Sequence, residues 1–116
     1  MPEYFVCEPY GPPLRTEQDA ADLVGEAIGH GANAVAIPVE RLHQDFFRLR
    51  TGVAGAIVGK LAVYRLGVAI VGDVSEHVAA SDSFRDWVRE ADRSTHLRFV
   101  ADLSDLQRGS QPESGL

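Results

Sequence analysis

Residues 34–73 read AVAIPVERLHQDFFRLRTGVAGAIVGKLAVYRLGVAIVGD, and this stretch decides the fold. It opens with one apolar run, AVAIPV at 34–39, and closes with another, LGVAIV at 66–71. Nearly continuous apolar runs of this length are typical of strands that are covered on both faces of a parallel sheet. Between the runs, apolar residues recur at helical spacing after Thr51 and Gly52. The stretch therefore predicts one β-α-β unit.

The segments on either side extend the alternation of strands and helices. YFVC at 4–7 predicts a first strand, and Thr16 is a natural N-cap for the helix that follows. Beyond residue 73, a short helical turn at 75–80 precedes a helix whose apolar stripe has i, i+3, i+4 and i+7 spacing and which Ser81 or Ser83 can cap. LRFV at 97–100 is the last predicted strand.

These elements predict a single three-layer α/β domain. We expect about four mostly parallel strands with helices on both faces of the sheet, because βαβ crossovers are right-handed. The domain is expected to span residues 1–107. The polar end at 108–116, rich in Gly, Pro and Ser, predicts a flexible C-terminal tail.

Composition excludes several classes of function. The formal net charge is −6 at pH 7 and Lys60 is the one lysine, so a broad contact with nucleic acid is not expected. A single cysteine, Cys7, excludes an internal disulfide and a thiolate metal cluster. The N-terminus shows neither a basic leader nor an apolar signal core, and no apolar run is long enough to span a bilayer. We expect a cytoplasmic protein that needs neither metal nor cofactor and does not bind membranes.

Polar side chains follow the predicted strands at their carboxyl ends, where ligands of open parallel sheets usually bind. The candidates for a ligand-binding crevice are Glu40, Arg41, His43, Asp73, Ser75 and Asp102. Three of these side chains are carboxylates, which can hold Mg²⁺ or serve acid–base chemistry, but acidic residues after strands also cap helices, and capping is the simpler interpretation.

The connection between the two apolar runs carries a second group of candidates. Thr51 is expected at a helix N-terminus, where backbone amides attract anions, and Arg48 and Arg50 lie beside it; a simple N-cap is again the simpler interpretation. Phe46 and Phe47 are adjacent on this loop, so we expect one to face inward and one outward as an anchor for a partner.

Three glycines share one face of the helix that follows this connection. They are Gly52, Gly55 and Gly59. Interior glycines cost helix stability, so close packing has to offset the cost. We expect this face to lie flat on the sheet, and the alternative is a contact between helices of two copies.

The chain resembles an uncharacterised bacterial family, domain-of-unknown-function family 4180. The resemblance rests on IPVERL at 37–42, on the DFF-L-TG-AG pattern at 45–55, on the K-Y-L-AIVGD pattern at 60–73 and on RDWVRE at 85–90. It covers nearly the whole chain and implies no established activity.

A wider resemblance is to the STAS domain, the anti-sigma-factor antagonist fold. In that family an Asp-Ser-Ser-Gly turn leads into a helix, and the first serine is commonly the phosphoacceptor. Here Thr51 and Gly52 match the second serine and the glycine, whereas Arg50 stands in place of the first serine and Leu49 in place of the aspartate. The resemblance implies a regulatory, partner-binding role without phosphorylation of the first serine position.

The sequence thus predicts a small non-catalytic regulatory or protein-interaction module of STAS-like type. Its contact surface is expected around residues 45–55, with the partner-binding residues Asp45, Phe46, Phe47, Arg48, Arg50, Thr51 and Gly52. The partner is expected to be another protein or a second copy of the chain in a homodimer. The alternative is a small enzyme or ligand-binding protein that uses the crevice at the carboxyl ends of the strands.

Overall fold

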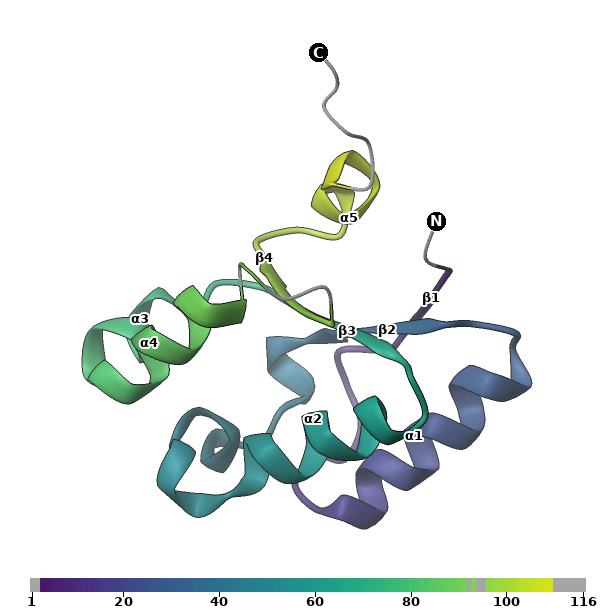
Figure 1. Cartoon of the computed structure of the whole chain (residues 1–116), viewed down its shortest axis with the longest axis horizontal. Helices are drawn as coiled ribbons and strands as arrows, with labels where there is room; N and C mark the ends of the chain where they lie inside the picture. The colour runs from purple at the N-terminus through teal and green to yellow at the C-terminus, as the bar shows by residue number, and fades with distance from the viewer. Residues whose placement is uncertain (1–2, 92, 94–95, 110–116) are drawn as a thin grey trace.

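The computed structural model describes residues 3–91, 93 and 96–109, and in them one parallel sheet is packed between helices (Figure 1). The strands are β1 (Tyr4–Val6), β2 (Ala34–Pro38), β3 (Gly67–Val71) and β4 (Leu97–Val100). The helices are α1 (Glu17–Gly29), α2 (Val53–Val63), α3 (Ser75–Ala80), α4 (Asp82–Ala91) and α5 (Ser104–Gly109). Three 3₁₀ turns fill the connection from β2 to α2: η1 (Val39–Arg41), η2 (Gln44–Phe47) and η3 (Leu49–Thr51).

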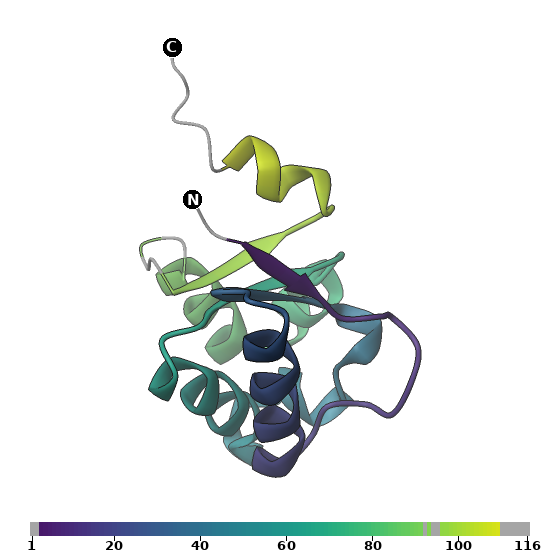
Figure 2. The same cartoon turned by 90° about the vertical axis from the view of Figure 1, so that its right-hand side faces the viewer.

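The sheet has the order β1-β2-β3-β4, and every neighbouring pair is parallel. Because each right-handed crossover steps in the same direction, α1 to α4 all lie on one face of the sheet. Figure 2 shows α5 alone on the opposite face. The predicted α/β fold with helices on both faces is confirmed, but the two helical layers are very unequal. The strand order never reverses, so the sheet has no topological switch point of the kind that opens a binding crevice in doubly wound folds.

The main core lies between the sheet and α1 to α4. Its largest fully buried side chains include Phe46, Phe84 and Ile37. The opposite face of the sheet carries small residues, and there Ala36 and Ala69 pack with Leu106 of α5. A small helix can approach that face closely because the strands present alanine to it.

The local signals at the start of α1 act as the sequence predicts. Thr16 is the N-cap, and its hydroxyl oxygen accepts a hydrogen bond from the Asp19 amide at 3.1 Å. Asp19 completes a capping box by accepting hydrogen bonds from the amides of Thr16 and Arg15, both at 2.9 Å. These amide donors lower the pKa of the Asp19 carboxyl group below its usual value.

The start of α2 differs from the prediction. Its N-cap is Gly52, which adopts a left-handed conformation with φ of 82°, and Thr51 belongs to the preceding turn η3. A residue with a Cβ rarely adopts this conformation, so glycine is needed to pass from the 3₁₀ turn into the helix. Thr51 keeps one contact with the helix, because its hydroxyl oxygen accepts a hydrogen bond from the Val53 amide at 3.3 Å.

The prediction that the glycine face of α2 lies on the sheet is wrong. A Cβ atom placed on Gly52, Gly55 or Gly59 would meet no heavy atom within 4 Å, and all three glycines are exposed. The helix instead buries Ala54, Ile57 and Leu61 on its other side. Since α2 is apolar nearly all the way round, the sequence pattern alone does not distinguish its buried face from its exposed one.

The C-terminal helix α5 continues to Gly109, two residues beyond the predicted domain boundary at 107. The rest of the predicted tail, residues 110–116, lies outside the described residues. In the part of the chain that the structure describes, no helix is both long and apolar enough to cross a membrane.

Candidate functional site

The connecting loop, residues 44–51, is held in place by its own aromatic side chains. Phe46 is fully buried and Phe47 is 7% exposed, so the prediction that one phenylalanine faces outward is wrong. The two rings meet edge to face with their centroids 5.4 Å apart. Neither ring is available to a partner in this conformation, and both serve the core.

An aromatic cluster connects this loop to the α3–α4 pair. The ring of Phe47 stacks on His77 of α3 with centroids 3.8 Å apart and an interplanar angle of 7°. Phe47 also meets Phe84 edge to face at 5.6 Å, and Phe46 lies 5.8 Å from Trp87. Aromatic pairs in such geometries stabilise beyond their buried area. The connecting loop is therefore fixed against α3 and α4, although about thirty residues separate them.

Hydrogen bonds fix the two ends of the connecting loop to each other. The Thr51 hydroxyl lies 2.7 Å from the Asp45 carbonyl oxygen and 2.8 Å from that of Arg48, and it donates to this pair. The Asp45 carboxylate lies 3.8 Å from the Arg15 Nε and 3.6 Å from His43 Nδ1. The Asp45 amide also donates to His43 Nδ1 at 3.0 Å. Asp45 and Thr51 thus have structural partners within the loop and beside it.

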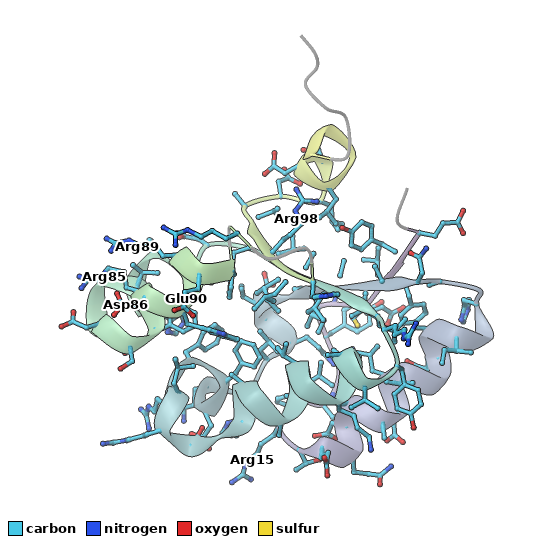
Figure 3. All side chains as sticks on the ribbon, in the orientation of Figure 1. Arg15, Arg85, Asp86, Arg89, Glu90 and Arg98 are labelled. Carbon is cyan, nitrogen blue, oxygen red and sulfur yellow. The ribbon has the colours of Figure 1, made fainter. Side chains whose placement is uncertain are left out.

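Arg48 and Arg50 differ from these neighbours because both are exposed and neither forms an ion pair within the described residues. Other arginines do form such pairs: Arg85 Nη2 lies 3.3 Å from an oxygen of Asp82. Figure 3 shows Arg85 and Arg89 on α4, away from the connecting loop. The connecting loop therefore carries two uncompensated positive charges on a chain whose formal net charge is −6.

These two arginines line a cavity of about 490 Å³ between the connecting loop and the α3–α4 pair. Its lining consists of Gln44, Phe47, Arg48, Leu49, Arg50, His77, Ala80, Ser81 and Ser83. None of the described Asp or Glu residues contributes to the lining. The two arginines thus make the cavity cationic, the serines can form hydrogen bonds in it, and Phe47, Leu49 and Ala80 form its apolar part.

The residues predicted for a strand-end crevice do not gather in one place. The Arg41 side chain turns toward the N-terminal loop, where Nε donates to the Pro12 carbonyl oxygen at 2.8 Å and Nη1 donates to that of Glu8 at 3.1 Å. Glu40 is exposed on η1, and His43 contacts Asp45 in the connecting loop. These three candidates serve separate parts of the structure.

The other three candidates lie at the ends of β3 and β4. Asp73 accepts a hydrogen bond from the Ser75 amide at 2.9 Å, and the Ser75 amide and hydroxyl lower the pKa of this carboxyl group. Asp102 accepts from the Ser104 amide at 3.3 Å. Asp73 and Ser75 line a shallow apolar depression of about 590 Å³, whereas Asp102 does not. Each aspartate therefore accepts a hydrogen bond from the first amide of the helix that follows its strand. Asp73 is not the N-cap of α3, however, because Val74 holds that position without a side-chain cap bond.

No group of three or more His, Cys, Asp or Glu side chains that could hold a metal ion occurs in the described ranges. The Cys7 side chain lies in the core at the end of β1. Burial raises the pKa of its thiol to about 11, a shift that the positive charge of Arg41 partly opposes. A thiol with so high a pKa is a poor nucleophile at neutral pH, so Cys7 acts as a small core side chain.

Sequence reasoning missed the half of the cavity that α3 and α4 contribute. Ser81 was expected only as a helix cap, a role it fulfils by accepting from the Phe84 amide at 3.2 Å. His77 and Ser83 were not connected with the residues around Arg48. No spacing pattern joins the two segments, because the aromatic cluster rather than the local sequence brings them together.

Comparison with known proteins identifies the family. No curated protein and no solved structure matches the chain. The family model described as Domain of unknown function (DUF4180) matches residues 2–109, which is nearly the whole sequence. That span includes the sheet, all five described helices and the cavity beside the connecting loop. The chain therefore belongs to the DUF4180 family.

Proposed function

We propose that this protein is a small, non-catalytic regulatory or protein-interaction module whose contact surface is centred on residues 45–55. The observation that carries the proposal is the pair of exposed arginines, Arg48 and Arg50, which have no ion-pair partner among the described residues. Uncompensated charges on a fixed surface attract a partner of opposite charge and orient it. The expected partner is therefore a protein with an acidic segment.

The rigid attachment of the connecting loop supports this role. A binding surface held by a packed scaffold loses little conformational entropy when the partner docks. Phe46 and Phe47 contribute to the scaffold, not to the contact, and the Thr51 hydroxyl closes the loop through Asp45 and Arg48. The contact surface that we propose is consequently polar and cationic, formed by the exposed side chains of Arg48, Arg50 and Thr51.

The regulatory part of the proposal rests on the resemblance of the turn at 49–52 to that of STAS domains. We also propose that the protein acts in the cytoplasm, as its sequence predicts, and in a bacterium, as its resemblance to a bacterial family implies. Arg50 stands where those domains commonly carry a phosphorylated serine. We therefore propose that this position is not switched by phosphorylation and carries a permanent positive charge instead. Control would then depend on what binds the arginines.

Capture of partners from the native host tests the proposal. The wild-type chain should retain an acidic protein that the double variant Arg48→Glu/Arg50→Glu loses. Arg89→Glu is the matched control, because Arg89 is an exposed arginine of α4 that does not line the cavity. Retention of the same protein by wild type and by the double variant would refute the proposal, as would its equal loss from both variants.

The alternative, an enzyme or ligand-binding protein that uses Glu40, Asp73 and Asp102, gains no support from the geometry. The three carboxylates are exposed, and Asp73 and Asp102 accept hydrogen bonds from the Ser75 and Ser104 amides at the starts of α3 and α5. Without a shared pocket these groups have no means to hold one substrate between them.

A further inference from the structure

The cavity beside the connecting loop has features that a second protein would not require. Its volume of about 490 Å³ lies within the range of about 300–1,000 Å³ that small-molecule pockets occupy. A contact between two proteins needs a broad surface and no cavity of this size. The cavity therefore has room for a small ligand, and its lining residues indicate which kind.

The charges on the cavity wall indicate an anion with more than one negative charge. Arg48 and Arg50 both line the cavity and no described acidic side chain does. Asp82 at the start of α4 does not line the cavity, and Arg85 lies 3.3 Å from it and 4.0 Å from Asp86. Two guanidinium groups match a phosphate monoester, which carries about −1.5 to −2 charges at neutral pH, better than they match a single carboxylate.

Hydrogen-bond donors on the opposite wall of the cavity also favour a phosphate ligand. The Ser81 oxygen accepts a bond from the Phe84 amide, and no bond within the described residues uses the Ser81 hydroxyl proton. The Ser83 side chain has no hydrogen-bond partner within those residues and is exposed. Phosphate oxygens accept several hydrogen bonds and donate few, so free hydroxyl protons and guanidinium N–H groups suit them.

The apolar part of the lining indicates that the ligand has a carbon skeleton. Leu49 and Ala80, which are more exposed than the 7% exposed Phe47, form part of the wall. Inorganic phosphate would leave this apolar surface in water, whereas an organic phosphate would cover it.

We propose that this cavity binds a small organic phosphomonoester, with the phosphate held by Arg48 and Arg50 and by the hydroxyl groups of Ser81 and Ser83. Binding of the ligand does not depend on the protein-interaction role, whereas its competition with a partner rests on that proposed function. Since the ligand and an acidic partner use the same arginines, the ligand competes with the partner. A phosphorylated metabolite would in this way control whether the module is free to dock.

Titration of the purified, isotopically labelled chain tests the proposal by NMR. The probes are glucose 6-phosphate and adenosine 5′-monophosphate, with glucose, adenosine and inorganic phosphate as controls at constant ionic strength. The two phosphomonoesters should shift the amide signals of residues 44–51 and 77–83 in a saturable way, more strongly than inorganic phosphate does. Glucose and adenosine should leave these signals unchanged.

Variants distinguish a defined site from general charge attraction. Arg48→Gln/Arg50→Gln should weaken binding by about tenfold or more, because charge-assisted hydrogen bonds are lost. Arg89→Gln should bind as the wild type does. Equal weakening in both variants, shifts spread over the whole surface, or no saturable shift with either phosphomonoester would overturn the proposal.

The outcome also separates this proposal from the protein-interaction role, because the titration contains no partner. A phosphoserine peptide serves as a further probe. If it binds and neither small phosphomonoester does, the small-ligand site is contradicted and the arginines are assigned to a protein contact. If the phosphomonoesters bind but no partner is captured, the ligand site is supported and the protein-interaction role is not.

Discussion

Thr51 closes the connecting loop through its side-chain hydroxyl. Its hydroxyl donates toward the carbonyl oxygens of Asp45 and Arg48 and accepts from the Val53 amide, so one side chain joins η2, η3 and the first turn of α2. The residue is exposed, and its contribution therefore comes from hydrogen bonding and not from burial. Thr51 thus closes the loop that carries Arg48 and Arg50.

Replacement of Thr51 by valine tests that role. Thr51→Val preserves the shape of the side chain and removes its hydrogen bonds, so we expect the free energy of unfolding to fall by about 1 kcal/mol. Urea denaturation followed by circular dichroism measures the change. Ser83→Ala is the control, since the Ser83 hydroxyl has no partner within the described residues, and it should change stability little. Equal effects of the two substitutions would contradict the account.

Asp19 gives a prediction that depends on pH. Its pKa is lowered by the amides of Arg15 and Thr16, so its contribution to stability is fully present above the ordinary pKa of an Asp carboxyl group. The contribution is lost as the pH falls through the lowered pKa. Asp19→Asn should cost about 1 kcal/mol at neutral pH and progressively less in acid. Urea denaturation of both proteins along a falling pH series measures the difference, and a difference that stays constant with pH would refute this explanation.

In helix α2, one glycine is required by the backbone conformation, whereas two nearby glycines lower the stability of the helix. Gly52 has a left-handed backbone and is required there, whereas Gly55 and Gly59 are exposed within the helix with open space around them. Nothing in the described structure offsets the cost of these two interior glycines. Either these glycines lower the stability of the helix without any compensating contact, or they pack against a second copy of the chain.

Alanine substitution separates these two possibilities. Gly55→Ala should raise the free energy of unfolding by about 0.5–1 kcal/mol, because alanine favours the helix and its Cβ meets no neighbour. Gly52→Ala should lower it by about 1–2 kcal/mol, because alanine disfavours a φ of 82°. Denaturation curves at two protein concentrations check both values. A destabilised Gly55→Ala variant with concentration-dependent unfolding would indicate a dimer through this face instead.

The elements were predictable where the apolar pattern is strong. The runs at 34–39 and 66–71 predict β2 and β3 because buried parallel strands are apolar on both faces. The connecting loop was not predictable, because 3₁₀ turns carry neither the helical nor the strand period. The orientations of Phe46 and Phe47 depend on aromatic partners in α3 and α4, and no local pattern in the sequence records such partners.

The whole molecule is asymmetric about its sheet. Four helices and the main core lie on one face, and α5 covers the other through a small cluster of Ala36, Ala69 and Leu106. In Figure 3, Arg98 of β4 projects toward α5 on this second face. The connecting loop and its cavity belong to the thicker layer, so the attachment of α5 and the shape of the cavity are supported by separate clusters.

This separation predicts how the molecule responds to loss of the α5 contact. Leu106→Ala should reduce the free energy of unfolding by about 2–3 kcal/mol, since a side chain that is 4% exposed loses its packing. Leu103→Ala should have a small effect because Leu103 is 43% exposed. Chemical denaturation measures both changes. The amide spectrum of residues 44–51 should stay unchanged in Leu106→Ala, and a rearranged connecting loop would show that the two clusters are coupled.

The central claim is that the cationic surface beside the connecting loop is where this protein meets its partner. The most direct test places a photo-crosslinking amino acid, p-benzoylphenylalanine, at Gln44 in the native host, with the same substitution at Arg89 as the control. Gln44 is exposed and lines the cavity without contributing charge, so Arg48 and Arg50 stay intact. Illumination should give a covalent adduct with one acidic protein from position 44 and none from position 89. Adducts from position 89 alone, or the absence of any adduct from position 44, would contradict the account.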